Sequence, residues 1–114
     1  MEEVRILQSS AMGYGNVSAE SIRHGLEWDP HVIVGQGTST DPGPYYMGSD
    51  SPYPYVGKAN KKRDISLILS AARQNDIPFI FSGGSPAGTD VQLEGILRIV
   101  DEYCREQGIR LRIA

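Results

Sequence analysis

Short apolar runs alternate along the chain with longer segments in which apolar residues recur every three or four positions. The apolar runs predict buried strands at 4–7, 31–34, 77–81 and 109–113. The longer segments predict three helices. The first is capped by Asn16 or Ser18 and stops at Asp29-Pro30, and the others span about 62–74 and 90–107. Gly108 is placed to end the last helix in a left-handed residue.

Strands and helices therefore alternate without a hairpin signal. Right-handed crossovers then require a parallel sheet with helices packed on its faces. The pattern predicts a three-layer, Rossmann-like α/β domain with a four-stranded parallel sheet and three helices. The 114 residues fit one domain, 1–114. Because the chain stops at the end of its last predicted strand, we expect the N-terminal portion of a longer architecture; the alternative is a small domain complete as it stands.

Composition excludes several classes of protein. The net charge is -3, which argues against a protein whose main task is binding a nucleic-acid backbone. No run approaches the roughly 18 apolar residues of a membrane span, and the N-terminus lacks the pattern of a secretory signal, so we expect a cytoplasmic protein without membrane contact. A single cysteine, Cys104, and two histidines provide neither a disulfide nor the spacing of a metal site.

Ligands of open parallel sheets bind beyond the carboxyl ends of the strands, where the unusual loops of this chain should meet. The first loop offers Ser9, Ser10 and Gly13 before a helix whose free amides could face an anion, although a plain turn explains it as well. It lacks the third glycine of a dinucleotide fingerprint and the Lys-Ser/Thr of a phosphate loop.

The third loop is the better anion cradle. The backbone amides of Gly83, Gly84 and Ser85 could converge on one point. Thr89 or Asp90 can cap the helix that follows. If Asp90 is not the cap, it could act as a base or a metal ligand in the same crevice.

The second loop, 35–48, is extreme in composition. The two prolines and the glycine after Asp41 predict a rigid backbone, which suits a positioned carboxylate, and Thr40 lies beside it. Tyr45 and Tyr46, with Tyr53 and Tyr55 further on, are typical of a pocket wall or an interface. The alternative is a lid over the sheet edge or packing against a missing partner domain.

Four basic residues lie at the entry to the second predicted helix, where cations oppose the helix dipole: Lys58, Lys61, Lys62 and Arg63. One of them could reach an anionic ligand or a loop carboxylate such as Asp41. A solvated run of charge is the alternative.

The segment Gly37-Thr38-Ser39-Thr40-Asp41-Pro42-Gly43-Pro44-Tyr45-Tyr46-Met47-Gly48 resembles the acyclic terpene utilization (AtuA-like) family. Val4-Arg5-Ile6-Leu7 and the loop from Ser82 to Asp90 support the resemblance, which covers only the N-terminal part of that family; the segment Ser51-Pro52-Tyr53-Pro54-Tyr55 departs from it. The resemblance implies catabolism of organic acids or their thioesters. It also implies site residues at Asp41, Tyr45, Tyr46 and Asp90.

The sequence thus favours the N-terminal domain of a cytoplasmic enzyme that binds a small carboxylate, phosphate or acyl thioester. Asp41 and Asp90 would be the acid/base or metal-binding carboxylates, and lyase or isomerase chemistry suits two carboxylates and a lysine better than hydride transfer does. No cofactor is identified. The alternative is a non-catalytic domain that docks through its tyrosine- and proline-rich loop onto a partner, a second copy or the rest of its own polypeptide.

Overall fold

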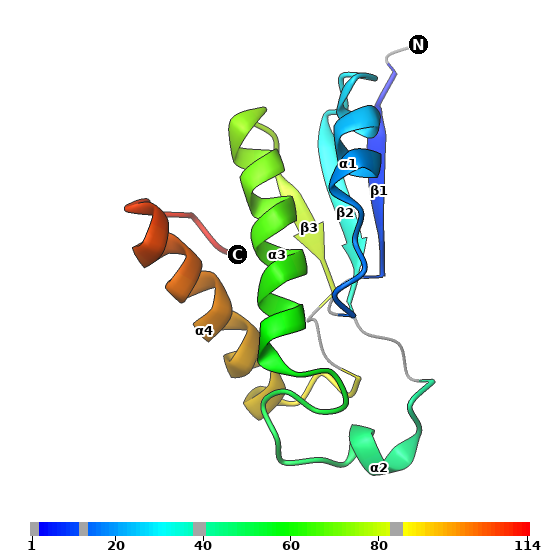
Figure 1. The fold of residues 1–114 in the computed structure, drawn as a ribbon, viewed down its shortest axis with the longest axis vertical. Helices are drawn as coiled ribbons and strands as arrows, with labels where there is room; N and C mark the ends of the chain where they lie inside the picture. Colours follow the sequence, from blue (N-terminus) through cyan, green and yellow to red (C-terminus); the bar gives the residue numbers. More distant parts are fainter. Residues whose placement is uncertain (1–2, 12–13, 38–40, 83–85) are drawn as a thin grey trace.

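The chain folds around one small parallel sheet. The computed structural model describes residues 3–11, 14–37, 41–82 and 86–114. In chain order the elements are β1 (Ile6–Ala11), α1 (Ala19–Leu26), β2 (Val32–Gln36), α2 (Pro44–Met47), α3 (Lys58–Gln74), β3 (Phe79–Phe81) and α4 (Asp90–Gln107) (Figure 1). The strands are parallel in the order β1-β2-β3. The predicted α/β class with a parallel sheet is confirmed.

The predicted fourth strand, 109–113, is wrong. Within the described residues the sheet has three strands, and the segment after α4 pairs with none of them. Its alternating pattern has another cause, because Ile109 and Leu111 are half-buried while Arg110 and Arg112 are exposed. Alternation reports one-sided burial, and a segment that lies beside α4 satisfies it without joining a sheet.

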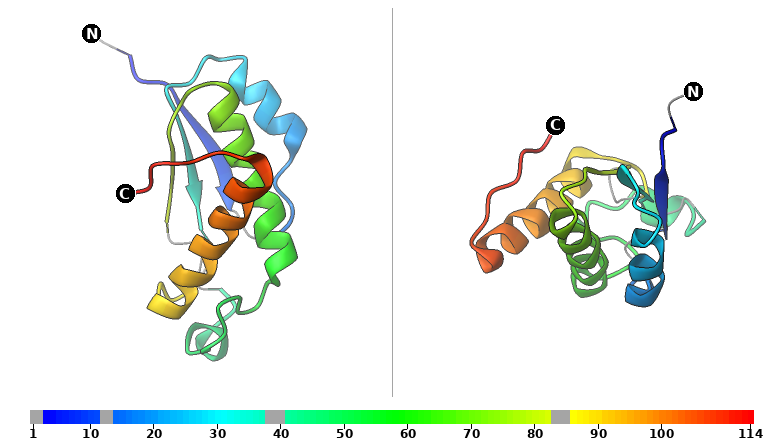
Figure 2. Two further views of the ribbon diagram at one scale, coloured as in Figure 1. Left: turned by 90° about the vertical axis from the view of Figure 1, so that its left-hand side faces the viewer. Right: turned by 90° about the horizontal axis from the view of Figure 1, so that it is seen from above.

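The three-layer prediction is also wrong. The strands follow one another in a single direction, so right-handed crossovers place α1 and α3 on the same face of the sheet. Figure 2 shows both helices on that face and α4 beside α3. No helix in the described part of the chain covers the other face, where Ile6 and Ile80 are 60% and 61% exposed.

Four helices are found in the described ranges where three were expected. The additional one, α2, is a single turn that starts at Pro44, whose fixed φ suits a first helical position. Ser18 caps α1 and Thr89 caps α4, each through its side-chain oxygen. The expected left-handed end of α4 at Gly108 is confirmed, with φ of 63°.

The core lies between the sheet and the helices and consists of two clusters. One joins Ile33 of β2 to Ile22 of α1 and Ile68 of α3. The other joins Ile65 of α3 to Ile96 and other buried residues of α4. Both clusters use the sheet-facing side of α3, which therefore fixes where the carboxyl ends of the strands lie relative to the helices.

Candidate functional site

The carboxyl ends of the three strands point to the same end of the molecule as the starts of α3 and α4 (Figure 1). The loops that leave β1, β2 and β3 all start there, and α2 lies at this end as well. We call this region the strand-end edge. The chain therefore leaves all three strands at one edge of the sheet, as the sequence predicted.

The predicted site residues fall into three groups. Gly13, Thr40, Gly83, Gly84 and Ser85 lie outside the described residues. Ser10 belongs to β1, and Ser9 beside it is buried. The two carboxylates predicted to do acid/base work and the two tyrosines belong to the strand-end segments: Asp41, Asp90, Tyr45 and Tyr46.

Both predicted carboxylates are exposed. Asp90 is the first residue of α4 and is not its cap, because Thr89 Oγ1 accepts a hydrogen bond from the amide of Gln92. A carboxylate in the first turn stabilises the positive end of a helix, which gives Asp90 a structural role whether or not it binds a ligand. Asp41 lies in the turn that leads into α2.

The strand-end edge holds two buried charges, Lys61 and Asp64, each 0% exposed. They lie one turn apart at the start of α3, on the same side as the core residues Ile65 and Ile68. Burial lowers the pKa of Lys61 to about 8, because an ammonium is less stable away from water. Lysine side chains are seldom buried this deeply. Buried charged groups of this kind are often found at functional sites.

Asp64 anchors the loop that follows β1. Its carboxylate accepts hydrogen bonds from the amides of Gly15 at 2.8 Å and Val17 at 3.3 Å, and from Arg63 Nη1 at 2.6 Å. Gly15 has φ of 76°, and a Cβ there would lie 2.8 Å from the side-chain oxygen of Asn60. The close approach of this loop to α3 therefore requires glycine.

The hydroxyl of Ser9 is the one buried side-chain polar atom without a hydrogen-bond partner among the described residues. Ser9 is 4% exposed and follows Leu7 by two positions, on the face of β1 that meets α1 and α3. Ser9 lies where the pairing of β1 with β2 is irregular, because the register shifts between Gln8 and Ala11. Buried hydroxyls without a partner cost about 1–3 kcal/mol, so a native example points to a polar group that completes it.

Two other members of the basic cluster, Lys58 and Lys62, form ion pairs at the protein surface. Lys58 and Lys62 contact Glu102, and Lys62 also lies 2.5 Å from Glu106. These contacts raise the pKa of Lys62 and lower that of Glu102. These side chains therefore form the solvated run of charge that was the alternative prediction, whereas the side chain of Lys61 is buried.

Further hydrogen bonds tie the strand-end loops to one another. The amide of Gly37, after β2, donates to Ser82 Oγ, after β3, at 2.8 Å. The side chain of Gln92, 0% exposed on α4, accepts from the amide of Ala87 and donates to the carbonyl of Ser49. These links join the second and third loops to each other and to α4, and the sequence did not point to Gln92.

A strained turn places Tyr55. Its φ is 67°, and the amide of Val56 donates to the carbonyl of Pro54 at 2.8 Å, which closes a γ-turn. Such a conformation costs about 1–3 kcal/mol for a non-glycine residue. Pro54 and Val56 are buried on either side of it, whereas Tyr55 is 53% exposed.

Four tyrosines meet edge to face around this turn. The ring of Tyr55 lies 6.1 Å from that of Tyr14 and 5.1 Å from that of Tyr46, and Tyr46 lies 5.1 Å from Tyr45, measured between ring centroids. We call these four residues the tyrosine row. Of the four tyrosines predicted to cluster, Tyr45, Tyr46 and Tyr55 belong to the row, and Tyr14 from the first loop joins them. Tyr53 instead packs against the core beside α4 and donates to the carbonyl of Gly95.

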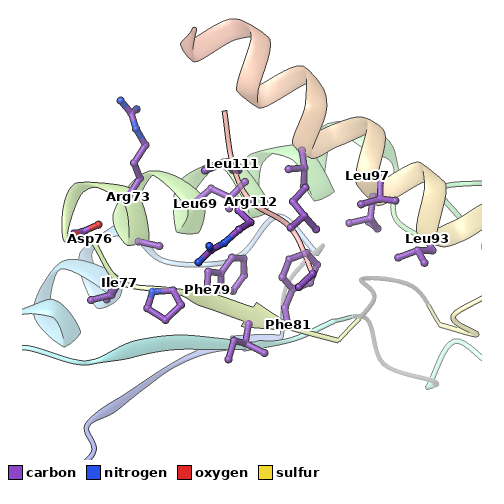
Figure 3. A pocket seen from close by; sticks show the side chains of 17 residues that line it. Leu69, Arg73, Asp76, Ile77, Phe79, Phe81, Leu93, Leu97, Leu111 and Arg112 are labelled. Atoms are coloured by element: carbon purple, nitrogen blue, oxygen red, sulfur yellow. The ribbon is translucent and has the colours of Figure 1, made fainter. Parts of the chain in front are cut away.

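An apolar groove of about 780 Å³ lies away from these residues, between β3, α4 and the C-terminal segment (Figure 3). Phe79, Phe81, Leu93 and Leu97 line it together with Leu111. Leu93 and Leu97 are apolar residues of α4, and they are 42% and 41% exposed. None of the predicted site residues that the structure describes lines this groove.

Among the described residues, no set of three or more His, Cys, Asp or Glu side chains could hold a metal ion. No helix in that part of the chain is both long and apolar enough to cross a membrane.

Comparisons with protein-family models, with curated proteins and with solved structures found no match to this chain. The resemblance to the AtuA-like family stays a prediction.

Proposed function

We propose that this chain is the N-terminal domain of a cytoplasmic catabolic enzyme that binds a small anion, a carboxylate, phosphate or acyl thioester, at the strand-end edge. The observation that carries this proposal is the burial of Lys61 at that edge. Opposite charges attract more strongly away from water than in it, so an anion beside this ammonium is held more tightly than one beside an exposed lysine. We therefore propose that the anionic group of the ligand contacts the ammonium of Lys61.

Two further features support the assignment. The unpaired hydroxyl of Ser9 lies in the same layer, between the sheet and the helices, and can donate to an anionic oxygen. Asp64 and Gln92 hold the surrounding loops, so the site is organised before a ligand arrives. Preorganisation of this kind reduces the entropic cost of binding.

For the reaction, we propose lyase or isomerase chemistry with Asp41 and Asp90 as acid and base. Both belong to segments at the strand-end edge and both are exposed, so either can reach a ligand there. Catabolism of organic acids or their thioesters, which the AtuA-like resemblance implies, fits this chemistry. Tyr45 and Tyr46 would then border the ligand.

A thermal-shift experiment tests the anion site without assuming a reaction. The probes are sodium acetate, inorganic phosphate and acetyl coenzyme A, each compared with sodium chloride at equal ionic strength. We expect at least one probe to raise the Tm of the wild type, and Lys61→Met to abolish the shift. Lys62→Met is the matched control and should keep it, because Lys62 faces Glu102 and Glu106. An equal shift in both variants would contradict the proposal.

The second candidate function is docking through the tyrosine- and proline-rich loop. It is favoured by Tyr45, which is 82% exposed and contacts the ring of Tyr46, so that an aromatic surface faces solvent. A docking domain should lose association with its partner on combined Tyr45→Ala and Tyr46→Ala substitution and tolerate Asp41→Asn. An enzyme should respond to Asp41→Asn while keeping its fold.

A further inference from the structure

The tyrosine row is built from three separate segments of the chain. Tyr14 follows β1, Tyr45 and Tyr46 belong to α2, and Tyr55 precedes α3. Their rings meet at interplanar angles of 63° to 90°. Edge-to-face rings leave ring faces available to a further planar group. The row therefore has the form of an aromatic wall with one strained residue, Tyr55, at its centre.

One end of the row adjoins the buried charges. Tyr14 precedes Gly15, whose amide donates to Asp64 at 2.8 Å, and Asp64 lies one helical turn from Lys61. The other end reaches solvent at Tyr45, which is 82% exposed. The row thus runs from solvent towards the residue that we assign to the anion.

The strain at Tyr55 follows from the position of its ring. Its neighbours Pro54 and Val56 are both buried, and the γ-turn allows this while the ring stays between those of Tyr14 and Tyr46. Strained residues persist where surrounding structure holds them, and they concentrate at ligand sites.

The charge of the surrounding segment limits the kind of ligand. Residues 32–57 contain no lysine or arginine, and their charged side chains are Asp41 and Asp50. A ligand with several phosphate groups along the row would be repelled. A ligand with a flat, uncharged ring system and a single negative charge at one end avoids this repulsion.

We infer that the ligand is a planar aromatic or conjugated monocarboxylate, whose ring lies along the tyrosine row and whose carboxylate points to Lys61. This inference rests on the proposed anion site and adds the class of its ligand. Planar groups gain from contact with tyrosine rings, whereas saturated rings of equal size gain less.

The test compares three probes by isothermal titration: trans-cinnamate, 3-cyclohexylpropionate and cinnamamide. The first two share a carboxylate and differ in planarity, and the third is planar without charge. We expect cinnamate to bind about tenfold more tightly than either of the others. Tyr55→Leu should bring the two acids to within about twofold of each other, with the affinity for 3-cyclohexylpropionate unchanged.

Trp28→Leu is the control for the loss of an exposed aromatic ring, because Trp28 is 79% exposed and lies between the end of α1 and the start of β2, away from the carboxyl ends of the strands. It should retain the full preference for cinnamate. Circular dichroism and Tm confirm that each variant is folded, and Tyr46→Leu replaces Tyr55→Leu if the latter is not.

The possible failures are distinguishable. If both acids bind equally well to the wild type, or if Tyr55→Leu keeps the preference, the ring specificity is overturned while the anion site stands. If cinnamamide binds as tightly as cinnamate, the anion site is overturned and the ligand class with it. If neither acid binds although acetate, phosphate or acetyl coenzyme A raises the Tm of the wild type and not that of Lys61→Met, the ligand class alone is overturned. If none of these anions binds either, both are overturned.

Discussion

Lys61 is the residue on which the proposed site depends most, and its burial has a consequence for stability. Its pKa is about 8 in the folded protein and near 10.5 when unfolded. Between these values the unfolded chain binds more protons, so the free energy of unfolding should rise as pH increases from 8 to 10.5. The shift corresponds to at most about 3 kcal/mol.

Urea unfolding at a series of pH values checks this prediction. We expect Lys61→Met to lack the part of the rise that wild type shows between pH 8 and 10.5. Lys62→Met should retain it, because its ion pairs raise the pKa of Lys62 and their contribution is lost only above 10.5. Parallel profiles for wild type and Lys61→Met would show that the ammonium is not buried.

We expect Ser9→Ala to raise the stability of the protein and to weaken anion binding. Ser9→Ala removes a buried hydroxyl without a partner, so we expect stability to increase by about 1 kcal/mol. The same change should weaken the anion-induced rise in Tm.

Ser70→Ala is the contrasting substitution, since Ser70 Oγ lies 2.9 Å from the hydroxyl of buried Tyr103. Its removal should destabilise the protein by about 1–2 kcal/mol, measured by the same urea unfolding. Equal losses for Ser9→Ala and Ser70→Ala would mean that Ser9 has a partner.

The sequence contains a signal that Lys61 lies on the buried side of its helix. Lys61 is four residues before Ile65 and seven before Ile68, so it continues the apolar stripe of α3 by one turn. The prediction began this helix at 62, and the stripe therefore seemed to start at Ile65. Gln92 and the strain at Tyr55 depend on contacts between distant segments, which periodicity does not report.

At the level of elements, the packing of the loop before α3 against α4 depends on Gly95. A Cβ at Gly95 would lie 2.6 Å from the carbonyl oxygen of Pro52, and Tyr53 Oη donates to the carbonyl of Gly95. Gly95→Ala should therefore displace this loop and cost about 1–3 kcal/mol in urea unfolding.

The matched control is Glu94→Ala, the adjacent residue, whose side chain is exposed and pairs only with Arg98 at the surface. It should change stability by less than about 0.5 kcal/mol. Gly95→Ala should also weaken any preference for planar ligands, because the same loop continues to Tyr55. If Gly95→Ala is as mild as the control, the loop is not held by α4.

Elements with signals at both ends were the most predictable. The bounds of α4 match the prediction because Thr89, the apolar stripe and Gly108 agree with one another. The strand predicted at 109–113 rested only on the alternation of apolar and polar residues. That pattern does not distinguish a strand from an irregular segment that buries one side. α2 is too short to have periodicity, although Pro44 marks its start.

The molecule as a whole has one sheet face that its own described helices leave open. Parallel sheets are usually covered on both faces, and here Ile6 and Ile80 are mostly exposed on the open one. The sequence predicted both faces covered because its apolar strands suit that arrangement. Strand order decides the outcome, and strand order cannot be inferred from local pattern.

The open face should bind an apolar dye. We expect Ile6→Thr combined with Ile80→Thr to reduce 1-anilinonaphthalene-8-sulfonate fluorescence with little loss of stability, because both side chains are already exposed. Val91→Thr, on α4 and 43% exposed, is the control and should leave the fluorescence unchanged. Unchanged fluorescence in the double variant would locate the dye elsewhere, as in the groove beside β3.

The most direct test of the anion site is the pKa of Lys61, measured by NMR on protein labelled with ¹⁵N at lysine Nζ. The pKa should be about 8 in the free protein and should rise towards 10.5 when trans-cinnamate saturates the site, because a bound carboxylate stabilises the ammonium. A pKa that is unchanged by saturating ligand, with ligand binding shown on the same sample, would contradict the assignment of the anion to Lys61.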